Sequence, residues 1–274
     1  MDSWLRNAYH KTRQLPVLRP MFERAYKRRF AHDRIDFNAY CGVYPDFATA
    51  LANAPTTMPI GYDHDVGATM YLSRTRYVLA CDYPAMFWLE RLLAEGCRTV
   101  FDFGGNIGIK YYAYQRYLRF PNDLRWMVCE LPKVVATGSA WAKDHDPSGQ
   151  IGFTENQADL SGQDVLFASG VLQYLDDTLW NLLDRLDRPP RHILVNVLPL
   201  HANLSFFTIQ NSALLYSVYR IMAHAEFVSA LAERGYRIRD QWDQLDRQCI
   251  IPFHPENTVE KYHGFLFSRT DERS

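Results

Sequence analysis

Short apolar runs alternate with amphipathic segments along most of the chain from residue 84 onward. Five of these runs predict strands, and they occupy residues 100–103, 126–129, 151–156, 165–168 and 192–200. Helical patterns separate them, and the first begins near Pro84 with apolar residues at three- and four-residue spacing. This alternation predicts an α/β fold with a mainly parallel sheet and helices on both faces.

The carboxyl-terminal part adds a helix over 223–234 and two further strand patterns at 236–242 and 262–267. We therefore predict a seven-stranded sheet. Residues 201–222 are rich in aromatic and polar side chains and have no clear helical period. We predict that a segment of about 199–222 forms a cap inserted after the fifth strand.

Residues 1–75 are predicted to form a helical and looped extension of a catalytic domain at 76–274. Residues 3–31 are basic, with apolar positions at helical spacing, and 47–51 predict a short helix between loops. We expect this N-terminal arm to pack on the main domain or on a second subunit. A homodimer formed through the arm is therefore a candidate assembly.

Charge and cysteine usage exclude several classes of protein. The net charge is −1, which argues against a general nucleic-acid binder, although residues 1–34 alone sum to +6. Five scattered cysteines without a C-x-x-C pair suggest neither a disulfide framework nor a thiolate zinc site. No run approaches the roughly 18 apolar residues of a membrane helix. We expect a cytoplasmic protein with no integral membrane contact.

One group of potential metal ligands lies on a predicted loop. His64 stands between Asp63 and Asp65. Adjacent residues on a loop seldom converge on one ion, so we interpret the group as a solvated loop. No metal site is predicted.

A glycine turn follows the first predicted strand. Gly104 and Gly105 directly follow residues 100–103, and Gly108 comes three residues later. The turn does not fit the dinucleotide pattern G-x-G-x-x-G, because Asn106 takes the place of the second glycine. The next strand ends at Glu130, a carboxylate that can hold ribose hydroxyls. A strand, a turn, a helix and an acidic strand end indicate a nucleotide-type site.

The pattern D-x-G-G-x-x-G from Asp102 to Gly108, together with Glu130, resembles motif I of the class I S-adenosylmethionine (SAM) dependent methyltransferases. The resemblance covers roughly residues 84–268. It implies a Rossmann-like fold with an antiparallel final strand, SAM bound at the turn, and its ribose on Glu130. On the segments GVYPDF, DFGGNIG, CELP, FASGVLQYL and IPFHPE, the chain is similar to a family of bacterial methyltransferase-like proteins of surface-polysaccharide and natural-product gene clusters.

The resemblance also suggests individual SAM-binding residues. An acidic residue after the third strand contacts the adenine amino group in the resembling families, which makes Asp159 a candidate. The residues predicted to bind SAM are Asp102, Gly104, Gly105, Asn106, Gly108, Glu130, Leu131, Asp159, Ser169 and Gly170.

The catalytic base is not evident from the sequence. Many small-molecule O-methyltransferases of this class carry a catalytic His after the fourth strand, in a pattern like V-L-H-x-L/W. Gln173 stands at that position here, and glutamine cannot take a proton at neutral pH. His201 or His224 from the cap, a relay through Tyr174, or an amine or carboxylate acceptor that needs little help all remain open. The predicted catalytic set is Tyr174, Gln173, Tyr112, Asn196 and His201.

Three functions are compatible with these residues. The first is transfer of a methyl group from SAM to a small-molecule substrate in bacterial secondary-metabolite or polysaccharide biosynthesis. In the second, SAM is itself the substrate, as in azetidine-2-carboxylate synthases, where the SAM amino group attacks its own γ-carbon and expels methylthioadenosine. The third is a non-catalytic partner protein of the same fold that acts through its basic arm.

Overall fold

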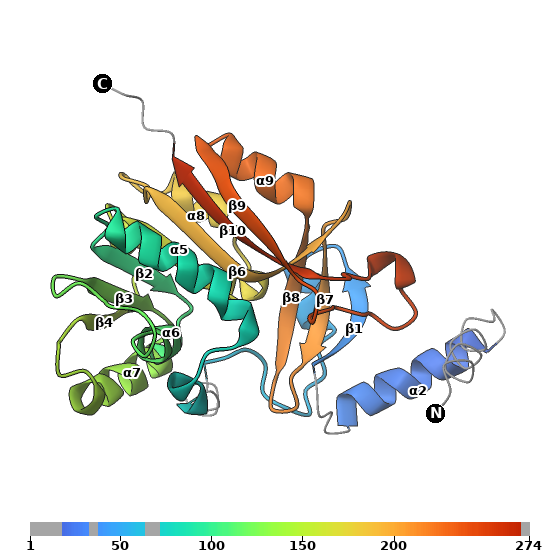
Figure 1. Ribbon diagram of the computed structural model, residues 1–274. Helices are drawn as coiled ribbons and strands as arrows, with labels where there is room; N and C mark the ends of the chain where they lie inside the picture. The colour runs from blue at the N-terminus through green and yellow to red at the C-terminus, as the bar shows by residue number, and fades with distance from the viewer. Residues whose placement is uncertain (1–17, 33–37, 64–71, 270–274) are drawn as a thin grey trace.

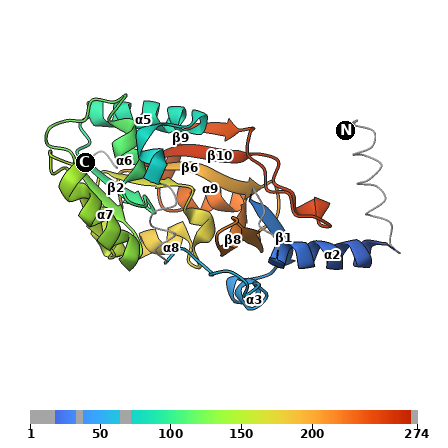
Figure 2. The ribbon, with the colours of Figure 1, turned by 90° about the horizontal axis from the view of Figure 1, so that it is seen from below.

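The computed structural model describes residues 18–32, 38–63 and 72–269. A twisted sheet runs through the molecule with helices on both sides, and a smaller group of strands lies at one end (Figures 1 and 2). The first part of the predicted arm helix lies outside the described residues, as do His64 and Asp65.

Seven strands make up the predicted sheet: β2 (Thr99–Phe103), β3 (Arg125–Cys129), β4 (Ile151–Thr154), β5 (Val165–Ser169), β6 (His192–His201), β9 (Tyr236–Gln244) and β10 (Tyr262–Arg269). Their spatial order is β4-β3-β2-β5-β6-β10-β9. Strands β2 to β6 pair in parallel, whereas β10 is antiparallel to both β6 and β9. This doubly wound arrangement confirms the predicted Rossmann-like α/β fold.

The helices of the described residues are α2 (Arg19–His32), α3 (Phe47–Ala52), α5 (Tyr83–Ala94), α6 (Ile109–Tyr114), α7 (Pro132–His145), α8 (Leu179–Asp184) and α9 (His224–Ala232). Short 3₁₀ turns are η1 (Leu72–Arg76), η2 (Ala80–Asp82), η3 (Gln157–Leu160), η4 (Leu172–Tyr174) and η5 (Pro255–Asn257). The predicted helix over 223–234 is confirmed as α9. Helix α8 begins only after Thr178, whose hydroxyl accepts a hydrogen bond from the backbone N–H of Asn181 and so caps the helix.

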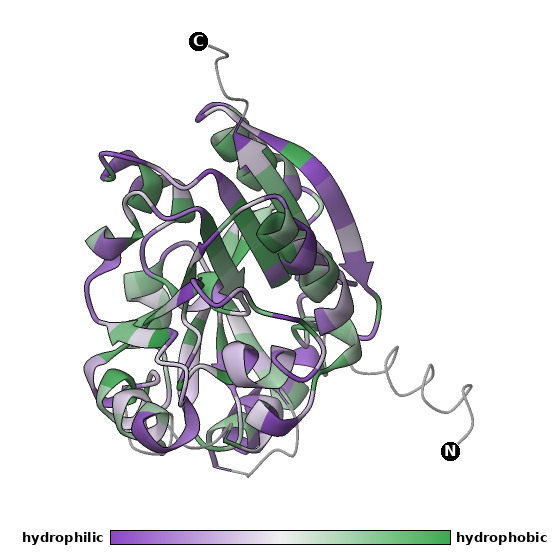
Figure 3. Cartoon of the chain, turned by 60° about the vertical axis from the view of Figure 1, so that its left-hand side comes forward, coloured by the Kyte–Doolittle hydropathy of each residue, from purple (hydrophilic) through white to green (hydrophobic). Residues whose placement is uncertain are grey.

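Hydrophobic cores lie on both faces of the sheet. Successive side chains of a strand point to opposite faces, so Phe101 of β2 packs with α8 and α9 whereas its neighbour Val100 packs with α5 and α6. The central strands are accordingly hydrophobic along most of their length (Figure 3). Burial on both faces is the reason that these strands read as continuous apolar runs in the sequence.

The cap is a β-structure. Strands β7 (Phe206–Asn211) and β8 (Tyr216–Ala223) form an antiparallel hairpin, and β1 (Ala39–Tyr44) pairs with β7. The sequence interpretation placed only loops around the short helix α3, so β1 corrects it. This strand depends on a partner about 170 residues further along the chain, and no local pattern announces such a pairing. The division into an extension at 1–75 and a domain at 76–274 stays a prediction.

Strand β6 connects the main sheet to the cap. It pairs with β5 as far as Asn196, and beyond Leu200 it pairs with β8. Between these stretches Val197 has a φ of +58°, a left-handed conformation that is costly for a β-branched residue. The strand pairing with β10 also shifts register here. The bulge directs β6 from one sheet to the other, and Val197 faces the cavity described below.

Candidate functional site

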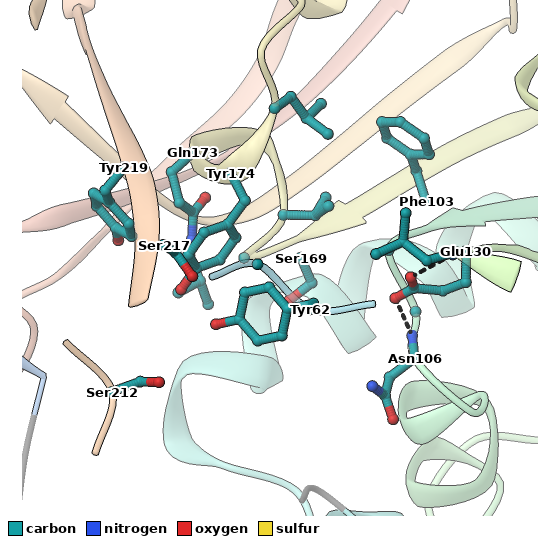
Figure 4. Close-up of a pocket in the computed structure, with 18 of the residues that line it drawn as sticks. Tyr62, Phe103, Asn106, Glu130, Ser169, Gln173, Tyr174, Ser212, Ser217 and Tyr219 are labelled. Carbon is teal, nitrogen blue, oxygen red and sulfur yellow. Dashed lines mark hydrogen bonds between the residues drawn. The ribbon is translucent and has the colours of Figure 1, made fainter. Parts of the chain in front are cut away.

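A cavity of about 960 Å³ opens at the carboxyl ends of β2, β3 and β5 and continues between the sheet and the cap. Ligands of open α/β sheets bind at this edge. Figure 4 shows the two ends of the cavity: Glu130 and Asn106 lie at one, and Gln173, Ser217 and Tyr219 lie at the other. The cavity therefore joins the glycine turn to the cap.

Each glycine of the turn has a steric reason to be glycine. A Cβ on Gly104 would lie 2.3 Å from Cγ2 of Val171, and one on Gly105 would lie 2.3 Å from Oδ2 of Asp102. Gly104 also has a φ of +71°, which favours glycine. Gly104 and Gly105 line the cavity, so a ligand can approach the backbone there. Gly108 does not line it; its hydrogen faces Ile151 of β4.

Two backbone groups hold the Glu130 carboxylate at the end of β3. Its Oε1 accepts a hydrogen bond from the N–H of Asn106 at 3.0 Å, and its Oε2 accepts one from the N–H of Leu131 at 3.0 Å. Burial raises the pKa of Glu130, and these two hydrogen bonds oppose the rise. The carboxylate is thus oriented beside the glycine turn, and Glu130, Asn106 and Leu131 all line the cavity.

Asp102 lies beneath the turn and is 1% exposed. Burial raises its pKa to about 7, against the opposing effects of a 3.0 Å hydrogen bond from Nε1 of Trp126 and of the Lys110 charge. Lys110 itself pairs with Asp82 at 2.6 Å. Asp102 borders the cavity floor and supports the turn rather than projecting into open space.

The cap end of the cavity is walled by five tyrosines, which we call the tyrosine chamber: Tyr40, Tyr62, Tyr174, Tyr219 and Tyr262. Their rings meet edge to face, with centroids 5.0 Å apart for Tyr62 and Tyr174 and 5.2 Å apart for Tyr174 and Tyr219. The hydroxyl of Tyr262 lies 3.1 Å from that of Tyr40 and 2.9 Å from that of Tyr219. Five separate segments of the chain supply these residues.

Three of the chamber tyrosines are poor bases. Burial raises the pKa of Tyr40 to about 12, and it raises the pKa values of Tyr219 and Tyr262 well above the ordinary value. These phenols therefore stay protonated at neutral pH, and they offer ring faces and hydroxyl groups rather than negative charge.

Two side-chain oxygens of the chamber lack hydrogen-bond partners among the described residues. Gln173 and Ser217 are each 3% exposed, and both line the cavity. The Oε1 atom of Gln173 and the Oγ atom of Ser217 are buried without a hydrogen bond to any described residue. Buried polar atoms are almost always paired in folded proteins, so this pair marks a place where a ligand can complete the hydrogen bonding.

A cationic side chain reaches the cavity from the loop between β9 and β10. Arg247 lines the cavity, and its Nη2 lies 3.7 Å from Sγ of Cys81. Its Nε is buried without a hydrogen bond, and no carboxylate of the described residues forms a salt bridge with it. Buried guanidinium groups are usually paired, which makes Arg247 a candidate ligand for an anionic group.

The structure gathers most of the predicted SAM-binding residues along the cavity. All of that set except Gly108 and Asp159 line it. Asp159 instead accepts hydrogen bonds from Thr154 and Asn156, while Gln157 of the same turn faces the cavity. Of the predicted catalytic set, Gln173 and Tyr174 line the cavity.

Two other members of the predicted catalytic set, Asn196 and His201, form hydrogen bonds within the protein and do not line the cavity. Oδ1 of Asn196 accepts hydrogen bonds from Trp242 and Gln244 of β9, and its Nδ2 donates to the Cys81 carbonyl. Nδ1 of His201 accepts two backbone N–H groups of the turn that follows β6.

Tyr112, the remaining member of the predicted catalytic set, and His224 do not line the cavity either. Tyr112 packs against Tyr111 and the back of Gly108. His224 of α9 lies beside Gln241 and His263, and it does not line the cavity.

Sequence reasoning missed the residues that the cap contributes. Ser217 and Tyr219 lie on β8, Tyr40 lies on β1, and Tyr262 begins β10. No motif links these positions, and only the pairing of β1, β7 and β8 brings them to one wall. The one available signal was the concentration of tyrosines, which by itself is typical of an ordinary core.

The described residues, 18–32, 38–63 and 72–269, include no group of three or more His, Cys, Asp or Glu side chains arranged to hold a metal ion. None of their helices combines the length and the apolar character needed to cross a membrane.

No protein-family profile and no curated protein matches the chain. Solved structures do resemble it. One is the 1,6-didemethyltoxoflavin-N1-methyltransferase of Burkholderia thailandensis with bound 1,6-didemethyltoxoflavin and S-adenosylhomocysteine, at 17% identity and a TM-score of 0.46 over 70% of this chain and 79% of that one. Another is the magnesium protoporphyrin IX methyltransferase of Synechocystis with bound SAM, at 13% identity and a TM-score of 0.47 over 77% and 86%. A third is an O-methyltransferase family protein of Burkholderia thailandensis, at 13% identity and a TM-score of 0.48 over 78% and 62%.

Proposed function

We propose that this protein binds SAM and transfers its methyl group to a small-molecule acceptor. The observation that carries the proposal is the single cavity that runs from the glycine turn and Glu130 to the tyrosine chamber. One end suits a nucleoside with an amino-acid tail, and the other end offers a separate, walled space for a second molecule.

The residues at the turn fit SAM in their chemistry. Glu130 is a fixed hydrogen-bond acceptor of the kind that holds ribose hydroxyls. The bare backbone at Gly104 and Gly105 leaves room for the amino-acid tail, and Leu131 with Gln157 offers an apolar and a polar surface for adenine. Arg247 and Lys110 are the cations that the proposal assigns to carboxylate recognition.

SAM, when bound, supplies an electrophilic methyl group on a sulfonium. The residues of this chain contribute alignment and a dry environment, which are the main requirements of such a displacement. Gln173 and Ser217 orient the acceptor, and the tyrosine rings exclude water from its nucleophilic atom. Asp102 supports the turn from below.

Calorimetry of the full chain with SAM tests the first half of this proposal, and we expect saturable binding. Mass spectrometry of SAM incubated with the protein and a panel of small acceptors tests the second half. Acceptor-dependent S-adenosylhomocysteine is the expected product. Methylthioadenosine released without an acceptor would indicate cyclisation of SAM instead, a reaction that no described feature of the site favours. Absence of SAM binding would favour the non-catalytic alternative.

A further inference from the structure

The unpaired atoms of the tyrosine chamber restrict what the acceptor can be. Oε1 of Gln173 is a carbonyl oxygen, so it can only accept a hydrogen bond. A ligand that satisfies it must therefore carry an N–H or an O–H group. Oγ of Ser217, on the β8 strand that packs against η4, can either accept or donate. A carboxylate or an ether oxygen would leave the Gln173 oxygen unsatisfied.

The side chains that line the chamber indicate whether the acceptor carries an N–H or an O–H group. The lining residues from β1, η4, β8 and the start of β10 include no carboxylate and no imidazole, and burial keeps Tyr40, Tyr219 and Tyr262 protonated. The carboxylates that line the cavity lie on other segments, at Asp102, Glu130, Glu155 and Asp246. An alcohol or a phenol must lose its proton as it attacks, which requires a base beside the oxygen. A neutral amine attacks with its lone pair and keeps its N–H during the attack.

Charge movement favours the same class of acceptor. Methyl transfer to an amine moves the positive charge from the sulfonium to the new ammonium nitrogen, so the acceptor end of the cavity must accommodate a cation. The rings of Tyr62, Tyr174 and Tyr219 adjoin one another in the chamber wall. Aromatic faces attract cations, most strongly where water is excluded.

We propose that the acceptor is a primary or secondary amine whose N–H donates to Gln173 Oε1 in the tyrosine chamber. This inference rests on the proposed methyl transfer. The nitrogen lone pair forms the new N–C bond, and the methyl C–S bond breaks with its electron pair left on sulfur as S-adenosylhomocysteine. The N-methylammonium product then loses a proton to water. A tertiary amine has no N–H in its neutral, nucleophilic form, so it cannot donate to Gln173 while it attacks.

Matched probes on one carbon skeleton test the proposal: 2-phenylethylamine, its N-methyl and N,N-dimethyl derivatives, 2-phenylethanol and 3-phenylpropanoate. Calorimetry on the full chain saturated with S-adenosylhomocysteine should show binding of the primary and secondary amines and no binding of 3-phenylpropanoate. The tertiary amine and the alcohol should accept no methyl group. With SAM that carries a trideuterated methyl group, mass spectrometry should place the label on nitrogen.

Variants separate a ligand contact from a structural role. Gln173→Leu should bind 2-phenylethylamine roughly tenfold more weakly, the effect of losing one buried hydrogen bond, while its melting temperature does not fall, because Oε1 bonds nothing in the protein. Gln173→Glu keeps an accepting oxygen and should retain binding. Ser217→Ala should weaken binding, and the exposed Ser229→Ala should not.

The possible outcomes are distinct. Equal binding of the carboxylate, label on the oxygen of the alcohol, or unchanged amine binding in Gln173→Leu would overturn the amine proposal. So would a protein that binds S-adenosylhomocysteine but none of the amines. A protein that does not bind S-adenosylhomocysteine at all would overturn the methyl-transfer function and the amine proposal with it.

Discussion

The Tyr174 hydroxyl donates a 3.0 Å hydrogen bond to Oε1 of Gln210. Tyr174 belongs to the turn after β5 and Gln210 to the cap strand β7, so this bond ties the main sheet to the cap at the wall of the cavity. Nε2 of Gln210 in turn donates to the Tyr40 hydroxyl at 3.2 Å. A buried chain of polar groups therefore fixes the position of the cap over the site.

Tyr174→Phe should destabilise the protein through this bond. Gln210 is 1% exposed, so the substitution leaves its oxygen buried without that donor, and we expect the free energy of unfolding to fall by about 1–3 kcal/mol. Urea denaturation measures the change. Tyr117→Phe is the matched control, because Tyr117 is largely exposed. Equal stability of the two variants would show that the Tyr174 bond does not hold the cap.

Glu130→Gln should weaken SAM binding more than it weakens the fold. Both carboxylate oxygens accept backbone N–H groups, and an amide has only one accepting oxygen, so its NH₂ group would face a second donor beside the turn. We expect a dissociation constant roughly 10- to 100-fold higher, corresponding to the loss of one charge-assisted hydrogen bond and the ribose contact.

Calorimetry with SAM provides the measurement for Glu130→Gln, and Glu90→Gln on the exposed side of α5 provides the control. Both variants remove one negative charge, so a purely long-range electrostatic effect would change the SAM affinity of both variants equally. Unchanged affinity in Glu130→Gln would remove the ribose role from this residue.

The central strands could be predicted because the apolar character that buries them is visible in the local sequence. Residues 165–168 are apolar on both faces, whichever elements cover them, and so their sequence already reads as a strand. The glycine turn and Glu130 were found for a similar reason. They were recognised by their spacing along the chain, and the parallel pairing of β2 with β3 places them side by side.

The chamber could not be predicted, because its parts are separated in sequence. Ser217 and Tyr40 become neighbours of the site only through the pairing of β1, β7 and β8. Asn196 illustrates the reverse case: it belongs to the predicted catalytic set, but it lies within β6, and Trp242 and Gln244 of β9 donate hydrogen bonds to its oxygen. Nothing in the local sequence reveals those partners.

Asp102→Asn should be more stable than the parent protein at pH 8. Burial raises the folded-state pKa of Asp102 from 3.8 to about 7, so this group contributes stability below pH 4 that is lost as the pH rises through 7. The amide stays neutral. We expect its stability advantage to shrink by about 2 kcal/mol between pH 8 and pH 5. The exposed Asp144→Asn should show no such trend in the same urea titrations.

His192→Gln should flatten the acid side of the stability profile. His192 is buried at the start of β6, with Nδ1 2.7 Å from Oγ of Ser268, and burial lowers its pKa from 6.5 to about 4. Because the unfolded chain binds a proton near pH 6.5 and the folded chain does not, stability is complete above pH 6.5 and falls toward pH 4. The linkage amounts to about 2 kcal/mol between pH 7.5 and pH 5.

Glutamine at position 192 can still bond Ser268 but does not titrate, so the variant should lose about 2 kcal/mol less than the parent protein over that range in urea titrations. Burial also lowers the pKa of His263, which adds a slope of the same sign, but that slope is present in both proteins and cancels in the comparison. Parallel profiles for the two proteins would mean that His192 takes up a proton in the folded state as readily as in the unfolded chain. That result would require water to reach the strand pair β6 and β10 at their outer end, where the structure places a buried imidazole.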